Sequence, residues 1–172
     1  LTELLCPRLA ESTPARVVNV TSNAYRAARS IRWDDLDWED SRYRPFAAYA
    51  HAKLGVILWT QELARRLEDS GVVANTVHPG TVRTRFGSRW GWPMSWLWGL
   101  VEPFMRGPHK GAETIVWLAA SREAADANGG HYLDLERQSL AVPAADEAAA
   151  RRLWDVLEKA TSDSHPSEQA AP

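Results

Sequence analysis

Short runs of β-branched residues alternate along this chain with longer segments of helical periodicity, and this alternation limits the fold more than any other feature. The runs that favour strands are residues 16–21, 72–78 and 131–135. Apolar residues at helical spacing predict helices over residues 1–10, 45–69, 109–120 and 146–160. Such alternation is typical of an α/β domain, in which a parallel sheet carries helices on both faces.

Composition and charge narrow the class of protein further. A chain of 172 residues with 45% hydrophobic and 24% charged residues suits one domain with a packed core. The net charge of −2 argues against the broad basic surface that nucleic-acid binding normally requires. The single cysteine, Cys6, excludes an intramolecular disulfide and a cysteine-based zinc site. No apolar run approaches the ~20 residues of a membrane-spanning helix, and no signal-peptide pattern is present, so we expect a cytoplasmic protein.

The sharpest local pattern is Tyr49-Ala-His-Ala-Lys53, which falls within the second predicted helix. Residues at positions i and i+4 share one helix face, so the phenol and the ammonium group point into the same space. A neighbouring cation favours the phenolate form, and a tyrosine in that setting can exchange a proton near neutral pH. By itself the spacing is a weak signal, because two ordinary surface residues satisfy it equally well.

Two further segments place candidate groups next to this helix. Ser22 follows the first predicted strand directly, and the turn at residues 79–84 follows the second. The carboxyl ends of parallel strands meet at one edge of a sheet, where open α/β sheets have their ligand crevice. We therefore expect Ser22, Tyr49, Lys53 and the turn to surround one site.

Three stretches of the chain resemble motifs of the short-chain dehydrogenase/reductase family: Val17-Val-Asn-Val-Thr-Ser22, Tyr49-x-x-x-Lys53 and His78-Pro-Gly-Thr-Val-Arg-Thr84. Residues 61–67 and 149–154 resemble its retinol-dehydrogenase-like branch. The resemblance covers about residues 1–160 and implies an incomplete Rossmann-type, doubly wound parallel sheet, made of the last three strands and their helices. We expect residues 161–172 to be a disordered tail.

The resemblance implies a role for each matching catalytic residue. Tyr49 would be the general acid or base that exchanges a proton with the substrate oxygen. Lys53 would assist Tyr49, and Ser22 would hydrogen-bond the substrate oxygen and stabilise its developing charge. The substrate would be an apolar small-molecule alcohol or carbonyl compound.

The resemblance also implies a nicotinamide cofactor, NAD or NADP, which carries the hydride. Tyr49 and Lys53 would both contact the cofactor, and Lys53 would hold the hydroxyls of the nicotinamide ribose. The remaining cofactor contacts would come from the turn after the second strand, with the nicotinamide near Pro79 and Gly80, its carboxamide near the backbone of Val82, and the pyrophosphate near Thr84.

The matching stretches belong to the second half of such a protein. The family's glycine-rich turn, its catalytic asparagine and the residues that select NAD or NADP have no counterpart in this sequence. We therefore expect a C-terminal portion of an oxidoreductase that is inactive without the dinucleotide-binding half. The strand at residues 16–21 would then be an exposed sheet edge, which favours association with other chains.

Several alternatives stay open at this stage. The chain can be a non-catalytic remnant that binds a partner, and the helix carrying Tyr49 can pack against its copy in a homodimer, as the resemblance implies. The four tryptophans between residues 90 and 98 suit a cap over an apolar substrate pocket, plain packing or weak membrane contact. A Ser22–His78–Asp hydrolase triad is disfavoured, because no G-x-S-x-G motif surrounds Ser22. No carboxylate cluster joins His51 and His78, so we expect no metal site.

Overall fold

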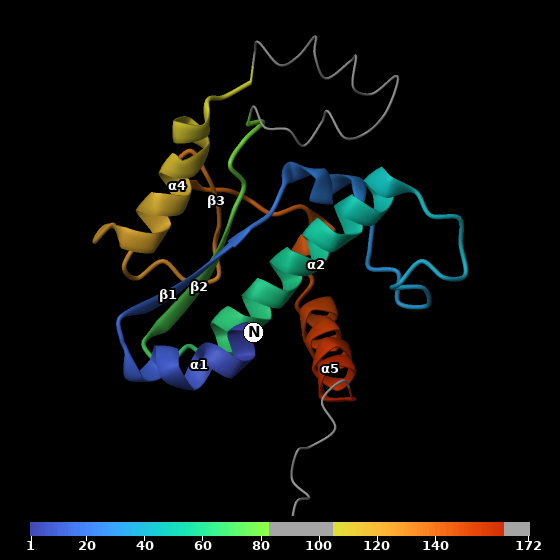
Figure 1. Ribbon diagram of the computed structural model, residues 1–172, viewed down its shortest axis with the longest axis horizontal. Helices are drawn as coiled ribbons and strands as arrows, with labels where there is room; N and C mark the ends of the chain where they lie inside the picture. Colours follow the sequence, from blue (N-terminus) through green and yellow to red (C-terminus); the bar gives the residue numbers. More distant parts are fainter. Residues whose placement is uncertain (83–104, 164–172) are drawn as a thin grey trace, which may run out of the picture.

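The computed structural model of the protein describes residues 1–82 and 105–163. Its helices are α1 (Thr2–Glu11), α2 (Pro45–Arg66), α4 (Pro108–Ala120) and α5 (Glu147–Asp163), with 3-10 turns η1 (Asn23–Ala27) and η4 (Val142–Ala144). The strands are β1 (Ala15–Val20), β2 (Val72–Val77), β3 (His131–Leu133) and β4 (Glu136–Arg137). They form one sheet in the order β1-β2-β3-β4 (Figure 1).

Alternate side chains of β1 face opposite layers of the molecule. Val17 packs with Leu63 of α2 in one hydrophobic cluster. Val18, the next residue, packs with Leu118 of α4 in another. Since these two clusters lie on opposite faces, α2 covers one face of the strands and α4 covers the other (Figure 1). Strands β1 and β2 pair in parallel. The predicted α/β fold with helices on both faces of a mostly parallel sheet is confirmed.

Helix α5 packs against α2. Trp154 of α5 stacks on Trp59 of α2, with ring centroids 5.6 Å apart and planes 7° apart. Leu153 joins a core cluster with Leu54 and Ile57 of α2. Helix α2 is therefore held between the sheet and α5, which explains why apolar residues occur on more than one of its faces.

The end of the sheet differs from the sequence-based prediction. The strand expected over residues 131–135 ends at Leu133, because Asp134 and Leu135 have φ values of 53° and 67° and reverse the chain. The reversal produces β4, which pairs antiparallel with β3. The expectation of three strands is therefore corrected to four. Helix α5 also continues to Asp163, three residues past its expected end at residue 160.

The other end of the sheet is formed by β1. Within residues 1–82 and 105–163, the sheet pairing of β1 is with β2 alone. Val20 at the end of this strand is 44% exposed, and α1, which lies near β1, has no buried residue. The predicted exposed edge at this strand is thus present in the structure.

Candidate functional site at the carboxyl edge of the sheet

Two hydrogen bonds join α2 to the carboxyl end of β1. Lys53 Nζ donates to the carbonyl oxygen of Val20 at 3.2 Å. Thr21 Oγ1 donates to the carbonyl oxygen of Lys53 at 3.0 Å. The backbone N–H of Thr21 also donates to Val77 at the end of β2, at 2.8 Å. These bonds hold the lysine at the sheet edge where the sequence predicts a site.

Tyr49 lies one helical turn before Lys53, on the same face of α2. Lys53 Nζ is 5.6 Å from the centroid of the Tyr49 ring, and both residues are half-buried. The i, i+4 spacing therefore places the phenol and the ammonium group together, as predicted. A phenol beside a cation at an open sheet edge is suited to proton exchange with a ligand oxygen.

Ser22 follows β1 and caps the 3-10 turn η1. Its Oγ accepts a hydrogen bond from the backbone N–H of Ala24 at 3.2 Å, and its carbonyl oxygen accepts one from Tyr25 at 3.1 Å. Tyr25 is fully buried and anchors the turn in the core. Since the capping bond uses Oγ only as an acceptor, the hydroxyl keeps its proton to donate elsewhere.

The turn after β2 is shaped by a glycine and by the segment before α4. Gly80 has a φ of +80°, which side chains other than glycine rarely adopt. The backbone N–H of Arg106 donates to Thr81 at 2.9 Å, and Arg106 forms a parallel bridge with Val82. A Cβ on Gly111 of α4 would lie 2.5 Å from a Val82 methyl group, so Val82 packs closely on that helix. The turn is therefore fixed from the α4 side.

The structure thus brings most of the predicted site residues to one edge. Lys53 bonds Val20 and Thr21, the two residues before Ser22, and Tyr49 is adjacent to Lys53. The turn with Pro79, Gly80 and Val82 continues from the neighbouring β2. Thr84 and the tryptophans at residues 90–98 lie outside the described residues.

Two buried histidines lie at strand ends near the turn: His78 directly follows β2, and His131 is the first residue of β3. Burial lowers the pKa of His78, and the charge of Arg106 lowers it further. Burial, followed by the effect of His78, lowers the pKa of His131 to about 4. His131 Nδ1 lies 3.1 Å from Thr76 Oγ1, and its ring meets Tyr25 edge-on at 5.7 Å. The sequence analysis did not predict that these histidines are buried. The one signal for it in the sequence is that both lie at the ends of predicted strands.

The described residues do not form the hydrogen bonds that a Ser22–His78–Asp hydrolase triad requires. In a Ser–His–Asp triad, one ring nitrogen of the histidine bonds the acid and the other bonds the serine. His78 Nδ1 is buried and has no hydrogen-bond partner within the described part of the chain. The nearby Asp134 is instead paired with Arg106.

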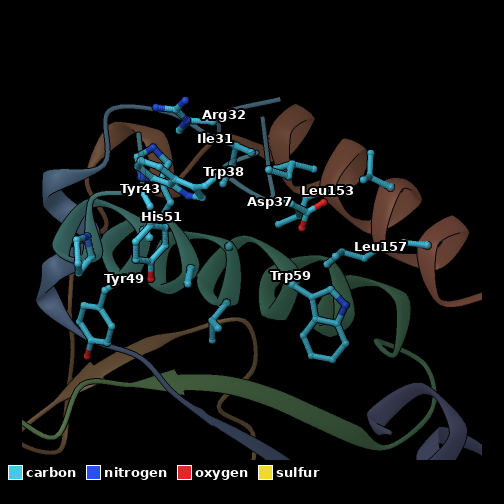
Figure 2. Close-up of a pocket in the computed structure, with 18 of the residues that line it drawn as sticks. Ile31, Arg32, Asp37, Trp38, Tyr43, Tyr49, His51, Trp59, Leu153 and Leu157 are labelled. Carbon is cyan, nitrogen blue, oxygen red and sulfur yellow. The ribbon is translucent and has the colours of Figure 1, made fainter. Parts of the chain in front are cut away.

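A groove of about 1050 Å³ runs beside Tyr49, between α2, α5 and the loop that precedes α2 (Figure 2). Trp38, Tyr43 and His51 lie around its Tyr49 end, whereas Leu153 and Leu157 lie near its Trp59 end (Figure 2). Such a mainly apolar lining suits an apolar ligand. The groove was not predicted, although the small residues Ala48, Ala52 and Gly55 recur on this face of α2.

No helix within residues 1–82 and 105–163 combines the length and apolar character needed to cross a membrane.

Comparison with protein-family models finds no match for this chain. Among curated proteins, retinol dehydrogenase 13 of Homo sapiens is 38% identical over 165 residues, which cover 90% of this chain and 48% of that protein. Retinol dehydrogenase 11 of Homo sapiens is 42% identical over 156 residues, covering 91% of this chain and 48% of the relative. The chain therefore spans about half the length of the curated relatives it matches.

A solved structure supports the same relationship at the level of the fold. The crystal structure of an uncharacterized protein from Mycobacterium Paratuberculosis superimposes with a TM-score of 0.60 and 28% identity, covering 86% of this chain and 50% of that one. The sequence motifs, the sheet and these relatives agree: the chain is a partial short-chain dehydrogenase/reductase, homologous to retinol dehydrogenases over nine tenths of its length.

Proposed function

We propose that this chain supplies the proton-transfer groups of an NAD- or NADP-dependent oxidoreductase that interconverts an alcohol and a carbonyl compound. The observation that carries the proposal is the pairing of Tyr49 and Lys53 on α2, with the ammonium group anchored at the strand end that leads to Ser22. The homology to proteins named retinol dehydrogenases supports it.

The residues present fit the nicotinamide end of such a cofactor. The Lys53 ammonium group, held at Val20, is a donor for ribose hydroxyls, and the half-buried turn at Pro79 and Gly80 follows the neighbouring strand β2. When bound, NAD or NADP supplies the hydride chemistry. The turn from Pro79 to Val82 would hold the nicotinamide, and Thr84 would hold the pyrophosphate.

The chain's own residues move the proton. In reduction, Tyr49 Oη donates its proton to the substrate oxygen, and in oxidation it accepts that proton. The hydroxyl of Ser22 donates a hydrogen bond to the same oxygen and stabilises the charge that develops there. The Lys53 ammonium group stabilises the phenolate that Tyr49 forms when it gives up its proton.

The first test measures cofactor binding to the 172-residue chain, by titrating its tryptophan fluorescence with NADH and with NADPH. Saturable binding supports the proposal and indicates which cofactor is preferred. A chain that is folded by circular dichroism and binds neither cofactor would refute the proposal for this polypeptide.

The second test removes the proposed acid–base group. We expect Tyr49→Phe to lower kcat for an apolar aldehyde by about 100-fold or more, since general acid–base catalysis typically contributes that much. The assay uses a longer natural protein that contains this chain, because we expect the chain alone to be inactive. Tyr43→Phe is the matched control, because Tyr43 is a 62% exposed phenol on the same groove. Equal activity of the Tyr49→Phe variant and the unmodified protein would sink the assignment.

We also propose that α2 forms a contact between two copies of the chain. Ala52, Gly55 and Val56 form a continuous stripe on α2 that faces the groove, and Ala52 is exposed. Small residues on a helix allow a second helix to approach closely, and symmetric dimers reuse one such patch on both partners.

A further inference from the structure

The turn after β2 lies against the side chain of Arg106. A Cβ built on Gly80 would lie 2.8 Å from Arg106 Cδ and 2.9 Å from Nε. The guanidinium end of Arg106 therefore packs directly on the backbone of this glycine. Such a close approach is possible only because position 80 has no side chain, so the packing of Arg106 on the turn depends on Gly80.

Arg106 also joins the turn to the far end of the sheet. Its backbone bonds Thr81 at 2.9 Å. Its side chain makes a two-pronged ion pair with Asp134, in which Nη2 donates to Oδ2 at 2.8 Å and Nη1 donates to Oδ1. Asp134 lies at the reversal between β3 and β4, with a φ of 53°. Three segments that are distant in sequence thus meet at one side chain.

The exposure of this pair indicates what it can contribute. The side chains of Arg106 and Asp134 are 35% and 41% exposed, and ion pairs at such exposure typically add only about 0–1 kcal/mol to the stability of a fold. The geometry is nevertheless restrictive, because a two-pronged pair fixes the plane of the guanidinium group. Its main effect is therefore on the conformation of the turn and not on the stability of the whole domain.

We propose that Arg106 is a positioning residue that holds the turn at Pro79, Gly80 and Thr81 in place, and that Asp134 fixes the guanidinium group against Gly80. The inference rests on the proposed function, in which this turn approaches the nicotinamide. Under it, loss of the pair leaves Tyr49 and Lys53 intact but lets the cofactor-facing turn move.

The test measures hydrogen exchange in the 172-residue chain at the backbone amide of Arg106, which donates to the carbonyl oxygen of Thr81 in the turn. The key variant is Asp134→Asn, which leaves Arg106 unmutated and removes only the carboxylate charge that fixes its guanidinium group. We expect exchange at this amide to become faster by about 10-fold, as local opening becomes easier, while exchange in α2 stays unchanged. The control is Arg151→Met, which removes the exposed pair with Glu147 on α5.

Arg106→Met should give the same effect, and Arg106→Lys should rescue it only in part, because an ammonium group cannot form the two-pronged pair. The double variant Arg106→Asp with Asp134→Arg tests whether charge alone suffices, and we expect it to leave the turn unprotected. Unchanged exchange in both Asp134→Asn and Arg106→Met would overturn the inference.

Cofactor titration separates this inference from the proposed function. If the unmodified chain binds NADH, we expect Asp134→Asn to raise its Kd by about 10-fold, which is 1.4 kcal/mol, while the KM of the aldehyde stays constant. Unaltered Kd and exchange would defeat the positioning role and leave the proposed function standing. If the unmodified chain binds no cofactor, the proposed function fails, and the exchange measurement alone decides whether Arg106 holds the turn.

Discussion

At the scale of single residues, buried His131 gives the fold a pH response of its own. Its pKa is lowered to about 4, chiefly by burial, from an ordinary value of 6.5. Between these two values the unfolded chain binds a proton that the folded chain does not. The free energy of unfolding therefore falls as the pH falls from 6.5 towards 4, and it is unaffected by this group above 6.5.

We predict that this residue costs the fold on the order of 3 kcal/mol between pH 6.5 and pH 4, since each unit of pKa difference corresponds to about 1.4 kcal/mol. Urea unfolding at a series of pH values measures the slope. His131→Gln should flatten it, whereas His109→Gln on the exposed start of α4 should not. An equally steep slope in the His131→Gln variant would show that other groups dominate, His78 first among them.

At the scale of elements, α2 has three faces with different roles. One of its faces packs on β1 and β2, another packs on α5, and the face with Ala52 and Gly55 lines the groove. Its lysine ties it to the strand end. The proposed acid–base pair is thus carried by the most constrained helix among the described residues, which suits a group that must be held in place.

The proposed contact between two copies is tested on the same helix. We expect Ala52→Arg to raise the dimer dissociation constant by about 10-fold or more, because the two symmetry-related charges would meet in an apolar contact. Sedimentation velocity over a range of concentrations measures the effect, and Ala52→Ser controls for the change of residue. Identical association in the Ala52→Arg variant would place the contact elsewhere.

At the scale of the whole molecule, the exposed edge of β1 is expected to govern how the chain associates with other chains. The edge of β1 that faces away from β2 has no strand partner within residues 1–82 and 105–163. Such an edge offers a row of backbone donors and acceptors to other chains, and α1 beside it leaves Leu4 77% exposed. We expect the 172-residue chain to aggregate as its concentration rises, even with Ala52→Arg present. Val20→Lys, which adds a charge at the end of this strand, should reduce light scattering several-fold. A sharp, reversible melt of a monomer at high concentration would contradict this expectation.

Local features of the sequence were enough to predict the main elements and the proposed acid–base pair. The strand and helix periods depend only on neighbouring residues, so β1, β2, α2 and α4 were found within a few residues of their ends. The spacing of Tyr49 and Lys53 defines a shared helix face without any tertiary information. The convergence with Ser22 followed from the rule that parallel strands end at one edge.

Only the tertiary structure decided the features that join distant segments. Arg106 and Asp134 are 28 residues apart, and no period or motif in the sequence pairs them. The reversal at Asp134, which adds β4, depends on backbone angles that this residue type only weakly favours. The shifted pKa of His131 and the groove beside Tyr49 depend on burial, which is set by what packs from elsewhere in the chain. Local patterns therefore determined the elements and the proposed proton-transfer pair, whereas long-range packing decided how the candidate site is held.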